Sequence, residues 1–224
     1  MRPEEIISSF ENKGFCIFNL GKSEVDAIPR LANELGSLTD GFYQNDSRQI
    51  SFFNASETIN TIEEIINSKA VAENITPNKT YIIRVVESGS TEMYRTHFDS
   101  HLYTLVIPLI LPKSESPLRG QFYFLNRFRK KPKSEIENLL GKSLAFIKYR
   151  GKRGMVKLER KESFREVDLK IGQAMLFEGS VSLHGNYENK SGVKRITLIL
   201  HFNDPFPFGA GYILRQFRSR FTRK

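Results

Sequence analysis

From Tyr81 onward, short apolar stretches alternate with Gly, Ser and Pro residues. Their length and their β-branched and aromatic content predict strands rather than helices. The expected strands cover residues 81–87, 92–98, 102–111, 120–126, 165–169, 174–178 and 193–203. Many short strands separated by turns are typical of a β-sandwich or jelly roll. We therefore predict a mainly β fold with flanking helices.

The first third of the chain, residues 1–79, is predicted to be helical with short strands between the helices. Apolar residues at helical spacing indicate helices over residues 3–12, 26–35 and 56–68, with strands at 14–18 and 49–54. Of the two candidate caps for the second helix, Ser23 and Asp26, we favour Asp26 because Pro29 then lies in the first turn. These helices are expected to support the sheet.

The whole chain, residues 1–224, is predicted to form a single domain with a β core over residues 80–203. A basic insertion, residues 127–164, interrupts this core and is expected to contain a helix over residues 134–147. Two interpretations of the insertion stay open: a solvated surface excursion, or a lid or wall that carries charge for an anionic substrate.

A basic C-terminal helix is predicted over residues 204–224. Ile213, Phe217 and Phe221 recur every four residues and would form one apolar stripe flanked by arginines. We favour docking of this stripe on the protein's own domain. An anionic surface and nucleic acid are the alternative partners of the segment.

The chain contains 34 Lys and Arg against 25 Asp and Glu, which gives a net charge of +9. A positive balance favours acidic partners or an anionic substrate. Cys16 is the single cysteine, so no internal disulfide is expected. The first residues lack the pattern of a signal peptide and no apolar stretch is long enough to span a bilayer, so we expect a cytoplasmic protein.

Two separated groups of residues carry the pattern of a metal site. His97 and Asp99 are two residues apart, so on an extended strand their side chains would share one face. His184 lies far along the chain, and ten residues separate it from Arg195, which shares its strand face with Thr197. Two imidazoles and one carboxylate with open coordination positions are typical of non-haem Fe(II) oxygenases.

In this order of motifs the chain resembles the Fe(II)/2-oxoglutarate-dependent dioxygenases, among them the phytanoyl-CoA and prolyl hydroxylases. The resemblance covers about residues 80–203 and implies a double-stranded β-helix, a jelly roll similar to that of the cupins. It also implies Fe(II), 2-oxoglutarate and O2 as cofactor and cosubstrates, with ascorbate in a supporting role. His97, Asp99 and His184 would bind the iron. Halogenating relatives lack the carboxylate, so Asp99 favours hydroxylation or another oxygen-dependent outcome.

Arg195 and Thr197 would bind the distal carboxylate of 2-oxoglutarate in this comparison. A buried guanidinium needs an anionic partner, and its planar fork matches a carboxylate. The alternative is a structural ion pair between Arg195 and an Asp or Glu of the protein.

Five further residues near the motifs are candidates for a role. Tyr94 is similar in position to residues that lie near the substrate in related hydroxylases, and the alternative is a packed aromatic. Two interpretations of His101 stay open, a rival iron ligand or a supporting or surface histidine, and we favour the second. His201 is predicted to line the barrel without binding iron, and either Tyr103 or Thr104 is a candidate to reach the cosubstrate.

The predicted activity is hydroxylation of an aliphatic C–H bond in a small amino-acid-like or natural-product substrate. Oxidative demethylation or hydroxylation of nucleic acid or protein is the first alternative, and nucleic-acid binding is not favoured. The second alternative is a non-catalytic metal-binding jelly roll that only recognises a ligand. Arg195 and Thr197 argue against the second alternative, because a bare binding module needs no cosubstrate clamp.

Overall fold

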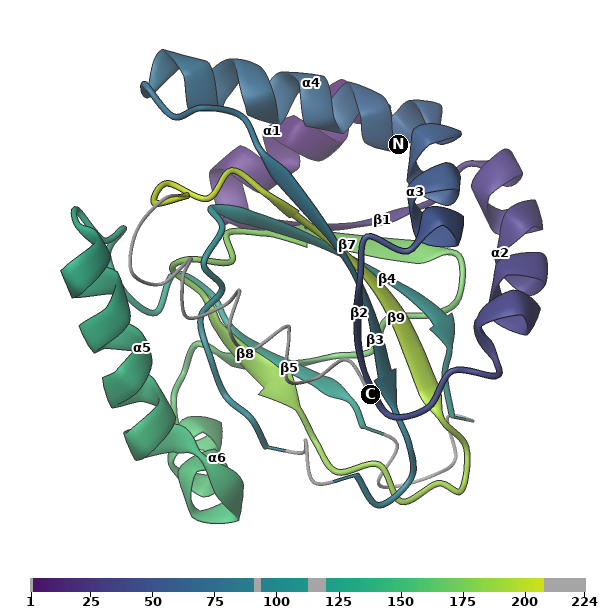
Figure 1. The fold of residues 1–224 in the computed structure, drawn as a ribbon. Coiled ribbons are helices and arrows are strands. Elements are labelled where there is room, and N and C mark those ends of the chain that lie inside the picture. Colours follow the sequence, from purple (N-terminus) through teal and green to yellow (C-terminus); the bar gives the residue numbers. More distant parts are fainter. Residues whose placement is uncertain (1, 91–93, 113–119, 208–224) are drawn as a thin grey trace.

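Two antiparallel sheets face each other in the computed structural model, which describes residues 2–90, 94–112 and 120–207 (Figure 1). The larger sheet has six strands in the order β1-β7-β4-β9-β3-β2, and the smaller has three in the order β6-β5-β8. The larger sheet consists of β1 (Phe15–Asn19), β2 (Gly41–Gln44), β3 (Lys79–Val86), β4 (Tyr103–Ile110), β7 (Gln173–Phe177) and β9 (Arg195–Phe202). The smaller sheet consists of β5 (Phe122–Leu125), β6 (Phe164–Val167) and β8 (Leu183–Asn186).

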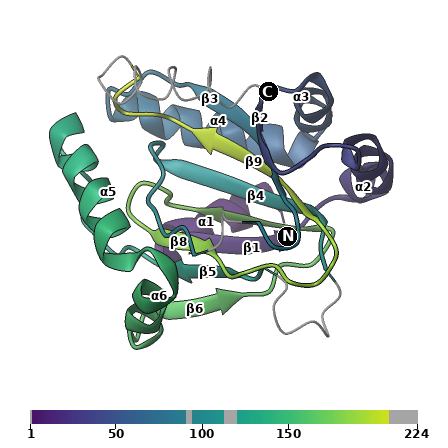
Figure 2. The ribbon, with the colours of Figure 1, turned by 60° about the horizontal axis from the view of Figure 1, so that its bottom comes forward.

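Helices cover the outer faces of both sheets (Figures 1 and 2). Four N-terminal helices pack on the larger sheet: α1 (Pro3–Lys13), α2 (Lys22–Leu35), α3 (Ser47–Asn54) and α4 (Glu57–Ala72). The remaining two, α5 (Glu135–Tyr149) and α6 (Gly151–Glu159), lie beside the smaller sheet. The predicted β-rich fold with flanking helices is confirmed.

The strand β9 shows how the alternation of side chains builds the layers. Ile196, Leu198, Leu200 and Phe202 are buried in the core between the larger sheet and the N-terminal helices. Because side chains alternate along a strand, Arg195, Thr197 and His201 point to the space between the two sheets. There Phe122 and Phe177 pack together in a second apolar cluster. The inner space between the sheets therefore receives the polar residues of the predicted motifs.

Several local predictions were wrong, each because a local or tertiary contact was missed. Residues 49–54 form part of helix α3, because Asp46 accepts a hydrogen bond from the amide of Arg48 and starts the helix. The cap of α2 is Gly21 and neither Ser23 nor Asp26, so Pro29 lies inside the helix.

The predicted strand over residues 92–98 is also not observed in the described part of the segment. Only His97 makes a bridge, and the backbone of Tyr94 is left-handed, with φ of 53°. The strands β2 and β8 and the helix α6 were not predicted. The predicted C-terminal helix lies mostly outside the described residues, and among the described helices none is long and apolar enough to cross a bilayer.

A buried carboxylate joins two of the supporting helices. Glu24 of α2 is 5% exposed and accepts hydrogen bonds from the hydroxyls of Ser56 (2.5 Å) and Ser23 (2.9 Å). Burial alone would raise the pKa of Glu24, but these hydrogen bonds lower it below its ordinary value. Ser56 is also the N-cap of α4 and accepts a hydrogen bond from the amide of Ile59.

We predict that Ser56→Ala lowers the free energy of unfolding by about 1–3 kcal/mol, because it removes a cap and a donor to a buried carboxylate. Urea unfolding monitored by circular dichroism measures this loss. Ser134→Ala is the matched control, since Ser134 caps α5 through the amide of Glu137 without a buried partner. Equal losses in the two variants would contradict a separate contribution from Glu24.

Candidate metal centre

An antiparallel bridge brings the two halves of the metal motif together. The amide of His97 donates to the carbonyl of His184 (2.9 Å), and the amide of His184 donates to the carbonyl of His97 (3.1 Å). His184 lies in β8, which pairs with β5 in the smaller sheet. The two imidazole rings consequently lie with their centroids 4.4 Å apart.

The side chains of His97, Asp99 and His184 present three ligand atoms that lie within 4.8 Å of one another. Asp99 Oδ1 is 3.6 Å from His97 Nε2, and Asp99 Oδ2 is 3.5 Å from His184 Nε2. The opposite ring nitrogens, Nδ1, face the backbone carbonyls of Arg95 (2.9 Å) and Ser182 (3.1 Å). A carbonyl only accepts, so each Nδ1 carries the proton and each Nε2 directs its lone pair to the centre.

Asp99 is held in place by both its backbone and its side chain. Its amide donates to the carbonyl of Gly179 (3.0 Å), and its Oδ2 accepts from the hydroxyl of Thr104 (2.6 Å). A side chain at position 179 would collide with Thr104 Oγ1 and bring a carbon within 2.7 Å of Asp99 Oδ2. Glycine is therefore required here for the close approach of Asp99 and Thr104.

The charge of Asp99 is maintained despite its burial. Burial opposes the charged form, but the imidazoles of His184 and His201 favour it, so the pKa of this carboxyl lies well below its ordinary value. A charged carboxylate beside two imidazoles that direct Nε2 to the same centre is a suitable donor set for a divalent first-row metal ion.

The other two histidines lie behind the carboxylate. Because the hydroxyl of Thr104 donates to Asp99, it accepts from His201 Nδ1 at 3.0 Å. The ring of His101 stacks on that of His201, with centroids 4.8 Å apart, and His101 Nε2 lies 3.3 Å from Thr80 Oγ1. Neither histidine belongs to the group of candidate ligands. Thr104, one of the two candidates to reach the cosubstrate, contacts Asp99, and its contact with the cosubstrate stays a prediction.

The three candidate ligands differ in exposure. The side chain of His97 is 48% exposed, whereas those of Asp99 and His184 are 7% exposed. The centre is thus closed on the side of the sheets and open on the side of His97. An open side is what a substrate or cosubstrate needs in order to reach a metal ion.

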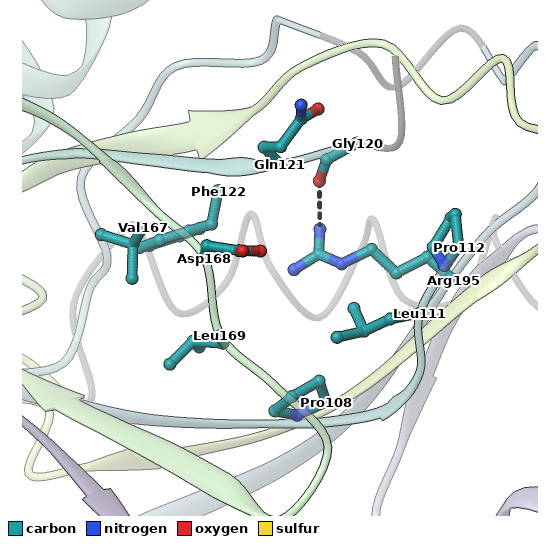
Figure 3. A pocket seen from close by; sticks show the side chains of 10 residues that line it. All are labelled: Pro108, Leu111, Pro112, Gly120, Gln121, Phe122, Val167, Asp168, Leu169 and Arg195. Atoms are coloured by element: carbon teal, nitrogen blue, oxygen red, sulfur yellow. Dashed lines mark hydrogen bonds between the residues drawn. The ribbon is translucent and has the colours of Figure 1, made fainter. Parts of the chain in front are cut away.

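Arg195 lines a small pocket between the two sheets, together with Pro108, Leu111, Pro112, Gly120, Gln121, Phe122, Val167, Asp168 and Leu169 (Figure 3). Its Nη1 donates to the carbonyl of Gly120 at 3.2 Å. The ring of Phe122 connects this pocket to the metal centre, because its centroid lies 5.7 Å from that of His184. Arg195 and the candidate ligands therefore belong to one inner region of the fold.

The pocket suits a carboxylate. Within the described residues no carboxylate lies within ion-pair distance of Arg195, although Asp168 shares the pocket. Burial and the nearby charge of Arg84 lower the pKa of Arg195 to about 10, so the guanidinium is still charged at neutral pH. A buried charge of this kind favours an anionic ligand. Thr197 is 3% exposed on the same strand face but does not line the pocket, so its role as a second donor stays a prediction.

Tyr94 packs in the apolar cluster under α5 and α6, and its ring meets that of Tyr187 edge to face at 6.1 Å. It is 9% exposed, as the interpretation of a packed aromatic predicts. Its contact with a substrate stays a prediction.

The insertion is anchored to the metal segment. The guanidinium of Arg129 lies 4.0 Å from the ring centroid of Phe98, the residue between two candidate ligands. Arg129 also donates to the carbonyl of Ser180 (2.8 Å) and to Asn138 Oδ1 (2.7 Å). Burial lowers the pKa of Arg129 to about 10. The inner side of the insertion is consequently a structural wall beside the centre.

No protein-family model matches the sequence, and no curated protein matches it. Solved structures do match. A Pseudomonas putida prolyl-4-hydroxylase has 12% identity and a TM-score of 0.53 over 90% of this chain and 98% of that chain. EvdO2 from Micromonospora carbonacea var. aurantiaca, complexed with 2-oxoglutarate, has 13% identity and a TM-score of 0.55 over 89% and 90%. EctD from S. alaskensis, with bound Fe, has 11% identity and a TM-score of 0.56 over 90% and 77%.

These similarities define the fold. It is the double-stranded β-helix of Fe(II)/2-oxoglutarate-dependent oxygenases, and the fold predicted from the resemblance is confirmed.

We predict that Thr104→Val weakens the binding of a divalent metal ion by roughly ten- to hundredfold, the usual effect of losing a group that orients a ligand. Valine keeps the shape of threonine but leaves Asp99 Oδ2 without its hydroxyl donor. Anaerobic titration with Fe(II), or with Mn(II) in air, measures the dissociation constant. Thr104→Ser is the matched control and should bind nearly as the wild type, and equal affinity in all three proteins would contradict the role of the hydroxyl.

Proposed function

We propose that the protein is an Fe(II)/2-oxoglutarate-dependent oxygenase that hydroxylates an aliphatic C–H bond. One observation carries this proposal: three ligand atoms of the required types converge beside a pocket that contains a buried arginine. The fold shared with oxygenases of this class supports it. The ligand set and the buried arginine are independent features, because they come from different strands and from different parts of the sequence.

In this proposal His97, Asp99 and His184 hold Fe(II). When bound with its cosubstrate, the iron supplies the oxidation that converts 2-oxoglutarate and O2 to succinate and CO2 and inserts one oxygen atom into the substrate. The protein's residues keep the ligands ready for the metal. The two Nδ1 protons are fixed by backbone carbonyls, and Thr104 fixes the carboxylate.

Arg195 binds the distal carboxylate of 2-oxoglutarate in this proposal. The guanidinium has donors left after its hydrogen bond to Gly120, and the apolar residues around it exclude water and strengthen an ion pair. A ligand held at this point lies toward Phe122 and His184, so its other end is directed to the metal centre. A non-catalytic binding module would have no use for this second site.

We further propose that the substrate is a small molecule of the amino-acid or natural-product type. Two structural neighbours support this choice: one is EctD with 5-hydroxyectoine, and another is a carbocyclase from nogalamycin biosynthesis. A mass-spectrometric screen for a gain of one oxygen atom, with Fe(II), ascorbate and 2-oxoglutarate present, tests it. Oligonucleotides and peptides belong in the same screen, and oxidation of these alone would contradict the small-molecule proposal.

We predict that alanine at His97, Asp99 or His184 weakens Fe(II) binding and ends 2-oxoglutarate turnover, because each substitution removes one ligand. His201→Ala is the control and should retain iron, since His201 contacts Thr104 rather than the metal position. Metal analysis of anaerobically loaded protein and a succinate assay measure the two effects. Full iron occupancy in His184→Ala would refute the ligand assignment.

We predict that Arg195→Ala weakens 2-oxoglutarate binding by about 1.5–3 kcal/mol, roughly ten- to more than hundredfold, because a charge-assisted contact is lost. Arg195→Lys keeps the charge but not the planar fork and should give an intermediate affinity. Titration calorimetry with Mn(II)-loaded protein measures the binding, and metal affinity in both variants should stay at the wild-type value. Unchanged 2-oxoglutarate affinity in Arg195→Ala would show that the pocket serves another ligand.

A further inference from the structure

Helix α5 presents apolar side chains to the solvent. Four of them, Ile136, Leu140, Leu144 and Ile147, are 71%, 59%, 66% and 78% exposed, respectively. Their spacing places them on one side of the helix, and we call this set the apolar stripe. A surface helix normally turns such a stripe to the core, so the orientation of α5 is the reverse of the usual one.

The side of α5 that faces the protein is smaller and more polar than the apolar stripe. It contains Asn138, Ala145 and Tyr149. The carbonyl of Tyr149 accepts a hydrogen bond from the hydroxyl of Thr96 (3.1 Å), and Lys142 Nζ donates to Ser100 Oγ (2.6 Å). These contacts hold α5 against the segment that carries His97 and Asp99, so the helix cannot turn its stripe inward without losing them.

The stripe stands on an outer flank of the molecule. Figures 1 and 2 show α5 at the periphery, with α6 against its C-terminal end and no other labelled helix or strand over its outer side. Several exposed large apolar residues on one helix are unusual for a surface that meets only water, and they indicate an interaction site.

The charge around the stripe identifies the kind of partner. The insertion, residues 127–164, contains 13 Lys and Arg against four Glu. Its net charge equals the +9 of the whole chain, so the remainder of the protein is balanced. Exposed basic residues precede α5 and continue through α6: Lys130, Lys131, Lys133, Lys148, Arg150, Lys152, Arg153 and Lys157.

We propose that the outer face of α5 binds the surface of a membrane that contains anionic lipids. A helix with an apolar stripe and basic flanks lies in the plane of the lipid headgroups, with its apolar side chains in the acyl boundary. Acidic headgroups attract nearby Lys and Arg, which adds to the apolar contribution. None of the described helices is long and apolar enough to cross a bilayer, so the association is peripheral.

Charge complementarity argues against the other occupants. The C-terminal segment, residues 208–224, for which the sequence predicts an apolar stripe, carries five Lys and Arg and no Asp or Glu. A second copy of the chain would bring an equally basic insertion to the same place. Both would repel the flanks of α5, whereas a lipid surface of opposite charge does not.

The proposal does not depend on the proposed enzymatic function. Membrane binding would nevertheless affect the enzyme. Because α5 packs on the segment that carries the candidate ligands, binding of α5 to a membrane would bring the metal centre close to the lipid surface.

Vesicle flotation tests the proposal with the full-length protein. We expect it to float with vesicles of phosphatidylcholine and phosphatidylglycerol, to bind phosphatidylcholine alone much more weakly, and to dissociate as salt is added. The triple variant Leu140→Gln, Leu144→Gln and Ile147→Gln should lose more than about tenfold in partitioning, because three inserted apolar side chains become polar. The matched control is Val71→Gln on α4, which is 60% exposed and should bind as the wild type.

A pair of charge variants separates the two contributions. Arg153→Glu with Lys157→Glu should weaken binding to the anionic vesicles, whereas Lys22→Glu with Lys170→Glu, outside the insertion, should not. Deletion of residues 208–224 should leave binding in place. Circular dichroism of every variant checks that its fold is retained.

Four results would overturn the proposal. The first is no flotation of the wild type at low salt. The second is binding that survives the triple variant but disappears when residues 208–224 are deleted, which would assign it to the tail. The third is sedimentation of the wild type as a dimer that the triple variant converts to a monomer, with no vesicle binding, which would make the stripe a self-association surface. Binding of an acidic peptide in place of vesicles would likewise contradict a lipid partner.

Discussion

The antiparallel bridge between His97 and His184 is the contact on which the candidate site depends. The segment before β4 is not part of a continuous strand, and one of its described residues, Tyr94, has a left-handed backbone. The two hydrogen bonds of the bridge (2.9 and 3.1 Å), with a third from the amide of Tyr94 to the carbonyl of Asn186 (2.9 Å), attach this irregular segment to β8. Strand β8 is itself paired along its length with β5. The bridge therefore transfers the rigidity of the smaller sheet to the ligands. It also places Asp99 where its own amide donates to the carbonyl of Gly179.

A buried carboxylate among four histidines would be costly without compensation, and the larger sheet provides it. Thr104 on β4 and His201 on β9 are paired residues in the sheet register, so their side chains lie next to each other on the inner face. The hydroxyl of Thr104 donates to Asp99 and accepts from His201. The three side chains therefore form a hydrogen-bond chain that runs from His201 through Thr104 to Asp99. The site is thus built between the sheets: the smaller sheet supplies His184, and the larger one supplies the support for the carboxylate.

The features that were predictable from the sequence are those with a period or a spacing. The apolar stretch over residues 193–203 predicted the strand that β9 forms. The motifs predicted that His97, Asp99 and His184 come together, and in the structure they do. Features set by contacts between distant residues were missed. The strand β8 has only four residues, one of them glycine, and its extended form depends on pairing with β5. Residues 49–54 have strand-like composition, yet the cap at Asp46 and the burial of Gln49, Phe52 and Phe53 at helical spacing favour a helix.

The insertion shows why a basic run cannot be interpreted from composition alone. The inner side of the insertion supplies hydrogen-bond partners to the irregular segment that carries His97 and Asp99. The amide of Gly151 donates to the carbonyl of Tyr94, and the carbonyl of Tyr149 accepts from the hydroxyl of Thr96. A merely solvated excursion would make no such contacts, so this interpretation does not account for the insertion. Its outer side keeps apolar residues in water, which opposes folding unless another surface covers them. The inner contacts fix the orientation of α5, and that orientation determines which residues face outward. Support of the metal segment and exposure of the stripe are therefore two consequences of the same packing.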